Sequence, residues 1–297
     1  MTTPYSIASS NKRKTIFILL FFIILVVTLA YIFARAYGYN GLTFAGIFLM
    51  VSGAVSFVSY YFSDSMILSL SHAKPATREH HFHFYTAVEN LCIASGLPMP
   101  KLYVIEDSAP NAFATGRDPK HAVIVSTTGL LEKLRPVEVE AVMAHELSHI
   151  KNYDTRVLAV VTILVGVIAL LSDFFMRSLW FRNDSDHKQN SLFLVIGIIA
   201  AILAPVTATI LQFAVSRKRE YLADADGALL TRYPEGLASA LEKIASDNEK
   251  LEAASVATSH LYFENPFKSG ERKNSWIINL FSTHPPVADR IKILRSM

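Results

Sequence analysis

Four long apolar runs do most to limit what this chain can fold into. The first two carry no charged residue, the third continues past Asp173, and the fourth contains Pro205 and Gln212. About 20 consecutive apolar residues in a helix cross a bilayer core, and proline is tolerated in such helices. Only 18% of the residues are charged, against about a quarter in typical soluble domains. The runs predict a mainly α integral membrane protein whose four transmembrane helices form two hairpins, at residues 15–34, 41–63, 157–176 and 191–215.

Lysine and arginine residues predict the orientation of these helices. Basic residues at 12–14 precede the first run, Lys151 and Arg156 precede the third, and basic residues at 217–219 follow the fourth. Such residues are enriched on the cytoplasmic side of membrane proteins. We therefore expect a cytoplasmic N-terminus at 1–14 and a cytoplasmic domain in two parts, residues 64–156 and 216–297. No cleavage site of a secretory signal follows the first run, which we expect to remain as an anchor.

Charge and cysteine content exclude several kinds of partner and site. The formal net charge is only +3, and no run of interleaved basic and aromatic residues suggests a surface for nucleic acid. Cys92 is the only cysteine, which excludes an intramolecular disulfide and a cysteine-based zinc site. We therefore expect a lipid bilayer, and no nucleic acid, among the partners of this chain.

The two cytoplasmic parts combine short strands with helices. Residues 102–107 and 121–126 are rich in β-branched side chains and predict strands. Pro136 stands in a favourable first position for a helix that continues to Ile150. Apolar periodicity and breaking residues predict further helices at 77–95, 218–231, 234–259 and 287–295. The expected domain is therefore α+β, with a small β-sheet.

The stretch His145-Glu146-Leu147-Ser148-His149 lies late in the helix that Pro136 opens. Residues four apart share one helical face, so the two imidazoles can bind one metal ion while Glu146 reaches a water molecule beside it. This is the HExxH arrangement of zinc peptidases, in which the glutamate acts as general base. The alternative is an amphipathic helix with exposed polar residues, which the apolar neighbours of the motif disfavour.

A catalytic zinc ion needs a third protein ligand. Glu220 is a candidate, and Asp224, one helical turn later, can hydrogen-bond a liganding histidine and fix its tautomer. Acidic residues at this spacing more often lie on a solvated face, so the inference depends on the membrane geometry. His149 is eight residues before Val157, and Glu220 is five after Val215. Unbroken helices would place them roughly 12 and 8 Å from the edge of the bilayer.

Several motifs together resemble the HtpX-type membrane zinc metallopeptidases, which are relatives of the CAAX prenyl proteases. They are HELSH before one apolar run, EYLAD after the next, NAFATG upstream and STHPPVADRI near the end. The resemblance covers nearly the whole chain and implies a gluzincin-like metallopeptidase domain with one Zn²⁺ ion. It implies endopeptidase activity on misfolded or surplus membrane proteins and unfolded polypeptides, as part of protein quality control and the stress response. The implied location is the bacterial cytoplasmic (inner) membrane, with the catalytic domain and both termini in the cytoplasm.

The resemblance also implies a role for each residue of the site. Glu146 would be the base, and His284 and Arg290 would lie near the reaction centre, as candidates for stabilising the oxyanion. Taken alone, the NAFA segment reads as an ordinary loop, but the resemblance makes it the edge strand that pairs with substrate. The implied metal ligands are His145, His149 and Glu220, with Asp224 behind them, and the implied substrate strand is Asn111, Ala112, Phe113 and Ala114.

Two other functions fit the same motifs. One is a processing peptidase for prenylated or signal-type substrates, and the other is a non-catalytic membrane scaffold that retains the fold. The histidine-rich stretch REHHFHF is not a feature that we associate with the family. On the expected helix, His80, His81 and His83 cannot share one face, which argues against a second metal site there.

Overall fold

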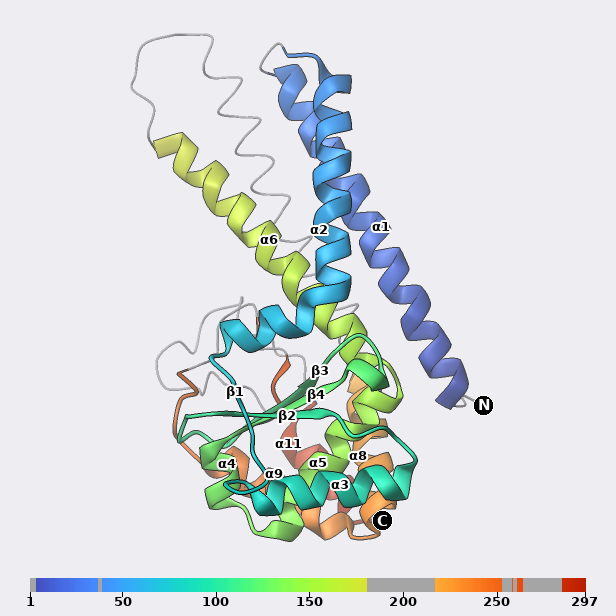
Figure 1. Cartoon of the computed structure of the whole chain (residues 1–297), viewed down its shortest axis with the longest axis vertical. Helices are drawn as coiled ribbons and strands as arrows, with labels where there is room; N and C mark the ends of the chain where they lie inside the picture. The colour runs from blue at the N-terminus through green and yellow to red at the C-terminus, as the bar shows by residue number, and fades with distance from the viewer. Residues whose placement is uncertain (1–3, 37–38, 181–216, 253–257, 259–260, 264–284) are drawn as a thin grey trace.

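The computed structural model describes residues 4–36, 39–180, 217–252, 258, 261–263 and 285–297. Figure 1 shows three long helices, α1 (Pro4–Ala36), α2 (Gly41–Leu70) and α6 (Asp154–Trp180), which extend from a globular part that contains the sheet and the other described helices. Within these described residues, two segments are long and apolar enough to cross a membrane, Ile7–Ile32 and Gly41–Leu70. The predicted third span lies within α6, and the predicted fourth lies outside the described residues.

The surfaces of α1 and α2 suit a lipid environment on one side and close helix packing on the other. Phe17 is 72% exposed and Met50 is 71% exposed. The inner side of α2 instead carries small residues, and small residues let membrane helices approach closely. Ser59 satisfies its hydroxyl by donating to the carbonyl of Val55 at 2.7 Å. The buried serines of α2 are Ser52, Ser56, Ser59 and Ser63.

The helices differ in length from the spans that hydropathy predicts. α1 begins at Pro4 and not at Thr15, and α2 continues past Ser63 to Leu70. Hydropathy marks only the apolar part of a helix, whereas the backbone hydrogen bonds continue into polar turns at each end. At the start of α2, Asn40 Oδ1 accepts hydrogen bonds from the N–H groups of Leu42 and Thr43, a normal N-cap.

The helix that carries HELSH does not run unbroken into the third span. α5 (Pro136–Lys151) ends before Asn152, and α6 begins at Asp154. Between them, Tyr153 has φ +59, in the left-handed region that terminates helices. The premise that placed His149 by helical rise from Val157 is therefore wrong, although His149 still lies close to the start of α6.

The small sheet has four strands in the order β1-β2-β4-β3. β2 and β4 pair in parallel, and the two outer pairs are antiparallel. The strands expected at 102–107 and 121–126 are confirmed, with ends shifted by one or two residues. β3 lies at one edge of the sheet, which matters for substrate binding. The strands are β1 (Lys74–Pro75), β2 (Lys101–Ile105), β3 (Ala112–Thr115) and β4 (Val123–Thr127), and a short 3-10 helix, η1, covers Pro119–His121.

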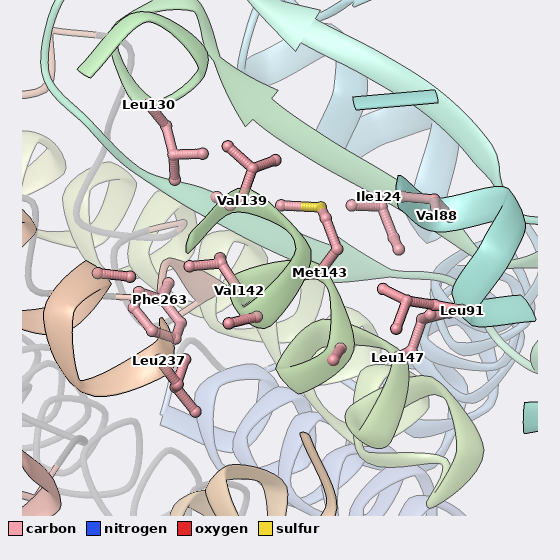
Figure 2. Packing of buried hydrophobic residues seen from close by; sticks show 14 of the residues in the cluster. Val88, Leu91, Ile124, Leu130, Val139, Val142, Met143, Leu147, Leu237 and Phe263 are labelled. Carbon is pink, nitrogen blue, oxygen red and sulfur yellow. The ribbon is translucent and has the colours of Figure 1, made fainter. Parts of the chain in front are cut away.

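α5 lies at the centre of the globular part, in contact with α3, α8, α9 and β3. Figure 2 shows Met143 of α5 towards Ile124 of β4, Val142 towards Phe263, and Leu147 beside Leu91. Each aliphatic side chain buried in this way contributes roughly 1.5–3 kcal/mol to folding, so α5 is firmly fixed. The surrounding helices are α3 (Phe82–Ser95), α4 (Thr128–Lys133), α8 (Arg217–Thr231), α9 (Pro234–Ser246) and α11 (Val287–Leu294).

Two of the expected helices are shorter than predicted. The helix expected from Thr77 begins at Phe82, and the helix expected to reach residue 259 ends at Ser246. At the other end of α3, Gly96 has φ +69 and its N–H donates to the carbonyl of Cys92, as the predicted stop requires.

Candidate metal centre

α5 holds the three ionisable side chains of HELSH inside the protein. His145 is 1% exposed, Glu146 3% and His149 8%. The two histidines lie on one face, with their Nε2 atoms 3.1 Å apart. Such deep burial of three ionisable groups is costly unless each has a partner, so the surrounding residues decide what this face of α5 can do.

α8 brings Glu220 to the two histidines. Its carboxylate oxygens lie 3.8 Å from His145 Nε2 and 3.6 Å from His149 Nε2. The ligand atoms of the three residues all lie within 4.8 Å of one another. Close approach of the two helices is possible because Gly227 of α8 faces the backbone of His145, where a Cβ atom would lie 3.1 Å from the His145 nitrogen. Glu220 therefore joins the histidines, as the sequence predicts.

The far nitrogen of each ring faces a carboxylate. His145 Nδ1 lies 2.9 Å from Asp224 Oδ1, and His149 Nδ1 lies 3.0 Å from Asp154 Oδ2. A carboxylate in this position holds the proton on Nδ1 and turns the Nε2 lone pair towards a metal ion. Two unprotonated Nε2 atoms 3.1 Å apart repel each other, and either a bound metal ion or a proton on one of them relieves this repulsion. The donor set therefore fits a metal ion, and a third anionic ligand completes it.

The charges of the buried side chains also favour a bound cation. Burial lowers the pKa of His145 to about 4, so this ring is neutral near pH 7. Burial also opposes a charge on His149, but the carboxylates of Asp154, Glu220 and Glu146 raise its pKa to about 9. Burial disfavours charge on Asp154 and Asp224 too, yet their histidine and arginine partners hold both pKa values below the usual range. The site thus gathers negative charge around one place for a cation.

Asp154 is the partner that the sequence analysis missed. It is the first residue of α6, five positions after His149, and is 3% exposed. The analysis sought a carboxylate partner for one histidine only and found Asp224. The general requirement that each metal-binding imidazole has a partner at its other nitrogen would have directed attention to Asp154, the nearest carboxylate after HELSH.

Arg290 lies beside the centre but points its guanidinium at Asp224. It is fully buried, and its Nε and Nη2 donate to the two Asp224 oxygens at 2.8 and 2.7 Å. Its Nη1 lies 4.0 Å from a Glu220 oxygen. The structure therefore brings Arg290 to the site through Asp224 and Glu220. His284, the other residue expected near the reaction centre, lies outside the described residues.

The NAFA segment forms most of an edge strand. Residues 112–115 make up β3, and Asn111 precedes it with its carbonyl accepting from the N–H of Thr127. Since alternate residues of an antiparallel strand face the same neighbour, Phe113 bonds to β4 while Ala112 and Ala114 direct their backbone groups away from β4. The interpretation of this segment as an ordinary loop is wrong, and the edge strand that the resemblance implied is present.

Phe263 connects this edge to the metal-binding residues. Its N–H donates to the carbonyl of Ala112 at 2.8 Å. Its ring lies edge-on to the ring of His145, with centroids 4.9 Å apart, and under the guanidinium of Arg290. One buried residue thus touches the edge strand, the first histidine and the arginine, which places the three next to one another.

The histidine-rich stretch lies elsewhere. Because α3 begins only at Phe82, His80 and His81 lie in the preceding turn, and the argument from one helical face does not apply to them. With His83 and Glu132 they line a cavity of about 400 Å³. Among the described residues, only His145, His149 and Glu220 gather their ligand atoms closely enough for a metal ion.

Comparison with known proteins identifies the family of this chain. Residues 83–297 match the sequence model of peptidase family M48. A Protease HtpX homolog of Dictyoglomus thermophilum is 45% identical over 295 residues, which cover 99% of this chain and 95% of the relative. Homologs with the same name from Caldanaerobacter subterraneus and Listeria monocytogenes are 41% and 39% identical, each over at least 97% of both chains.

Among solved structures, S. mikatae Ste24p matches with a TM-score of 0.49 at 20% identity. The match covers 90% of this chain but only 62% of the Ste24p chain. The sequence matches carry the assignment, because both the family model and the three homologs extend over the helices that present His145, His149 and Glu220. The chain therefore belongs to peptidase family M48 and is a metalloprotease of the HtpX type.

Proposed function

We propose that this protein is a membrane-bound zinc endopeptidase that cleaves misfolded or surplus membrane proteins at the cytoplasmic face of the bacterial inner membrane. The observation that carries the proposal is the convergence of three ligand atoms within 4.8 Å, with a carboxylate behind each histidine. His145, His149 and Glu220 would hold the ion. A zinc ion bound there would polarise the scissile carbonyl and lower the pKa of a water molecule towards about 7.

Glu146 is the proposed general base. It is adjacent to a proposed ligand and buried, yet it does not belong to the group of three ligand residues. Its charge already acts on His149. A carboxylate so placed can take a proton from the attacking water and deliver it to the leaving amine.

Asp154, Asp224 and Arg290 are proposed to orient the ligands. Each aspartate keeps one imidazole in the tautomer that presents Nε2. Arg290 holds Asp224 with two hydrogen bonds and places its charge 4.0 Å from Glu220. We therefore assign Arg290 a positioning role, and we leave stabilisation of the oxyanion to His284 and the metal ion.

Substrate is proposed to bind along β3 as an added strand. Peptidases and other peptide-binding proteins use exposed sheet edges in this way. The backbone of Ala114 faces away from β4, whereas the carbonyl of Ala112 already accepts from Phe263. Main-chain pairing would accept many sequences, which suits an enzyme that removes unfolded segments.

We propose four spans, with the catalytic domain and both termini in the cytoplasm. Two described segments meet the length and hydropathy of a span, and the apolar run at 157–176 lies in α6. Basic residues on the proposed cytoplasmic side support the orientation. We propose membrane-protein quality-control partners as well, on the resemblance of the HELSH, EYLAD and NAFATG motifs.

Two substitutions test the roles of the glutamates. Glu146→Gln removes the proton acceptor but no ligand, so zinc should stay bound while turnover falls by about 10²-fold or more. Glu220→Gln replaces an anionic ligand by a weak one, so zinc content and activity should fall together. Glu140→Gln, at a half-buried position on α5, is the matched control and should change neither.

The measurement is zinc per chain alongside hydrolysis of an unfolded substrate in detergent. Loss of zinc from Glu146→Gln with retention in Glu220→Gln would reverse the assignment. Full hydrolysis by Glu146→Gln would place the activity at another site. Cleavage only of prenylated or signal-type substrates by the parent would favour a processing peptidase.

A further inference from the structure

We infer that Asn11, on the membrane helix α1, is a positioning residue of the metal centre and acts on His149 through Asp154. The inference rests on the proposed assignment of His149 as a ligand. It gives α1 a role beyond anchoring, because the end of this helix nearest the globular part would then set how firmly the metal ion is held.

Asn11 makes two hydrogen bonds at the joint between α5 and α6. Its Nδ2 donates to Asp154 Oδ1 at 2.7 Å and to the carbonyl of Asn152 at 2.8 Å. The side chain is 1% exposed, so both bonds are shielded from water. Asp154 in turn contacts His149 Nδ1 through its other oxygen, at 3.0 Å. A continuous path therefore joins α1 to a proposed ligand.

The same aspartate collects a second donor from α8. Arg219 Nη1 donates to Asp154 Oδ1 at 2.8 Å and lies 3.5 Å from Asn11 Oδ1. Arg219 directly precedes Glu220, the proposed third ligand. Asp154 thus lies where α1, α5, α6 and α8 meet, and its position is fixed by groups on three of them. Weakening one donor should loosen the carboxylate without releasing it completely.

A purely local role for Asn11 explains only part of this arrangement. One of its bonds satisfies a carbonyl at the end of α5, which any helix end requires. Lys12 also lies over the Tyr153 ring, with its Nζ 4.3 Å from the ring centroid. Two successive residues of α1 therefore contact the connection between α5 and α6. The second bond, however, goes to the oxygen of a carboxylate that orients His149, and partners of this kind change metal affinity when they are removed.

The test measures zinc affinity of the full-length protein in detergent. Metal-free protein is titrated with Zn²⁺ in competition with a chelating indicator. Asn11→Leu keeps the size but loses the donor, and we expect the dissociation constant for zinc to rise by about 3–10-fold, below the 10–100-fold typical of a direct partner of a ligand. Asn11→Asp places a second carboxylate against Asp154 and should weaken binding further. Ser9→Ala, exposed on the same helix, is the control and should bind as the parent does.

A double substitution separates positioning from general damage. Asp154→Asn alone should raise the dissociation constant by about 10–100-fold, and adding Asn11→Leu should then have almost no further effect, since the path is already broken. Visible spectra of the Co²⁺-loaded proteins should shift in Asn11→Leu, because the orientation of His149 changes, and not in Ser9→Ala.

Equal zinc affinity of the Asn11→Leu protein and the parent would overturn the inference, as would additive losses in the double variant. Both results leave the proposed function intact as long as the parent binds one zinc ion per chain. A parent that binds no zinc would instead overturn the proposed function itself.

Discussion

Arg290 shows how much of this site depends on single buried residues. Removing one partner of a buried ion pair costs about 3–5 kcal/mol, because the other charge is left without compensation. Arg290→Met should therefore lower the free energy of unfolding by an amount on this scale. It should also weaken zinc binding, since Asp224 would no longer be held against His145. Arg290→Lys should fall between the parent and Arg290→Met, because an ammonium cannot make the two parallel bonds.

Arg295 provides the matched control for this prediction. It pairs with Glu235 and Glu242 next to the end of α11, but these three side chains are about half exposed. Such surface pairs contribute at most about 1 kcal/mol, so Arg295→Met should bind zinc as the parent does. Chemical unfolding in detergent and zinc titration measure the two effects. A loss of the same size in both variants would contradict the special role of Arg290.

We expect Glu138, in the first turn of α5, to make the stability of the fold depend on pH. Burial alone would raise its pKa, but Arg135, Lys243 and Ser239 lower it to about 2. Its charge therefore stabilises the fold above about pH 4.5, and this stabilisation is lost as the pH falls towards 2. Glu138→Gln should reduce the free energy of unfolding by about 1–2 kcal/mol near pH 7, and the difference from the parent should shrink steadily below pH 4.5.

Unfolding of the parent and the variant across this pH range is the measurement. Glu132→Gln, at an exposed position on α4, serves as the control and should differ little from the parent at any pH. A difference between Glu138→Gln and the parent that stays constant down to about pH 2 would show that the charge of Glu138 is not what stabilises α5.

At the level of residues, the sequence predicted that His145, His149 and Glu220 come together, and the structure brings their ligand atoms within 4.8 Å of one another. It missed some of the side chains that contact them. HELSH encodes its geometry locally, since two histidines four apart on a helix must share a face. Glu220 is far away in sequence, and it was linked to HELSH because it closely follows one apolar run while HELSH closely precedes another. That argument assumed an unbroken helix after HELSH, and the structure has a break at Tyr153. Asp154 and Asn11 depend on the turn at Asn152–Tyr153 and on how α1 packs. Neither follows from a local pattern, so sequence alone did not reveal them.

Among the helices, the contact between α5 and α8 is the one that assembles the centre. Gly227 allows it, because a Cβ atom there would lie 3.1 Å from the nitrogen and 3.3 Å from the Cα of His145. Gly227→Ala would gain about 1 kcal/mol of helix propensity, but the backbone of α5 cannot move aside easily, and overpacking costs about 1–3 kcal/mol. We expect α8 to shift away from α5, so that zinc affinity falls by about 10-fold while the helices still form.

Gly46→Ala is the control for this change, because no atom lies within 4 Å of the added methyl group. Zinc titration and circular dichroism of both variants are the measurements. Unchanged zinc affinity in Gly227→Ala would show that the two helices tolerate a wider separation than this geometry suggests.

Some boundaries of helices and strands could not be predicted from the residue pattern of the sequence. The strands at β2 and β4 were predictable because β-branched residues fill them, but β3 is short and was read as a loop from its residues alone. It is a strand because β4 supplies its hydrogen bonds and buried neighbours, which is tertiary information. Likewise, the break between α5 and α6 has no glycine or proline to mark it and depends on a left-handed tyrosine.

At the scale of the whole molecule, the path from α1 to the metal centre makes the membrane part of the enzyme more than an anchor. α1 touches the α5–α6 joint, and α6 continues from it. The edge strand β3 lies against both α5 and α6. Arg156 near the start of α6 donates to the carbonyl of Arg117, two residues beyond β3. The proposed substrate edge and the membrane helices are therefore joined by direct contacts.

This arrangement predicts that the enzyme prefers substrates presented by a membrane. A substrate tail on the same side of the membrane as the globular part must be flexible and long enough to reach Ala114 and pair along β3. Cleavage in liposomes should therefore be slow for tethered substrates whose cleavable segment starts at the membrane anchor. It should rise once a Gly/Ser linker spans the gap, and fall again with much longer linkers, because effective concentration decreases as linkers grow. The same segment without an anchor should be cleaved more slowly than the best tethered form.

The test uses a matched set of tethered substrates, in which the sequence and flexibility of the cleavable segment are the same. Each substrate carries the same cleavable segment, and a second series replaces one central residue of that segment by proline, which has no backbone N–H to donate to an edge strand. If β3 binds substrate by strand addition, the proline series should lose cleavage near the substitution at every linker length. If cleavage ignores the anchor, the membrane serves only to hold the enzyme. If proline does not affect cleavage either, the substrate does not pair along Ala112–Ala114, and it must bind to another face of the globular part.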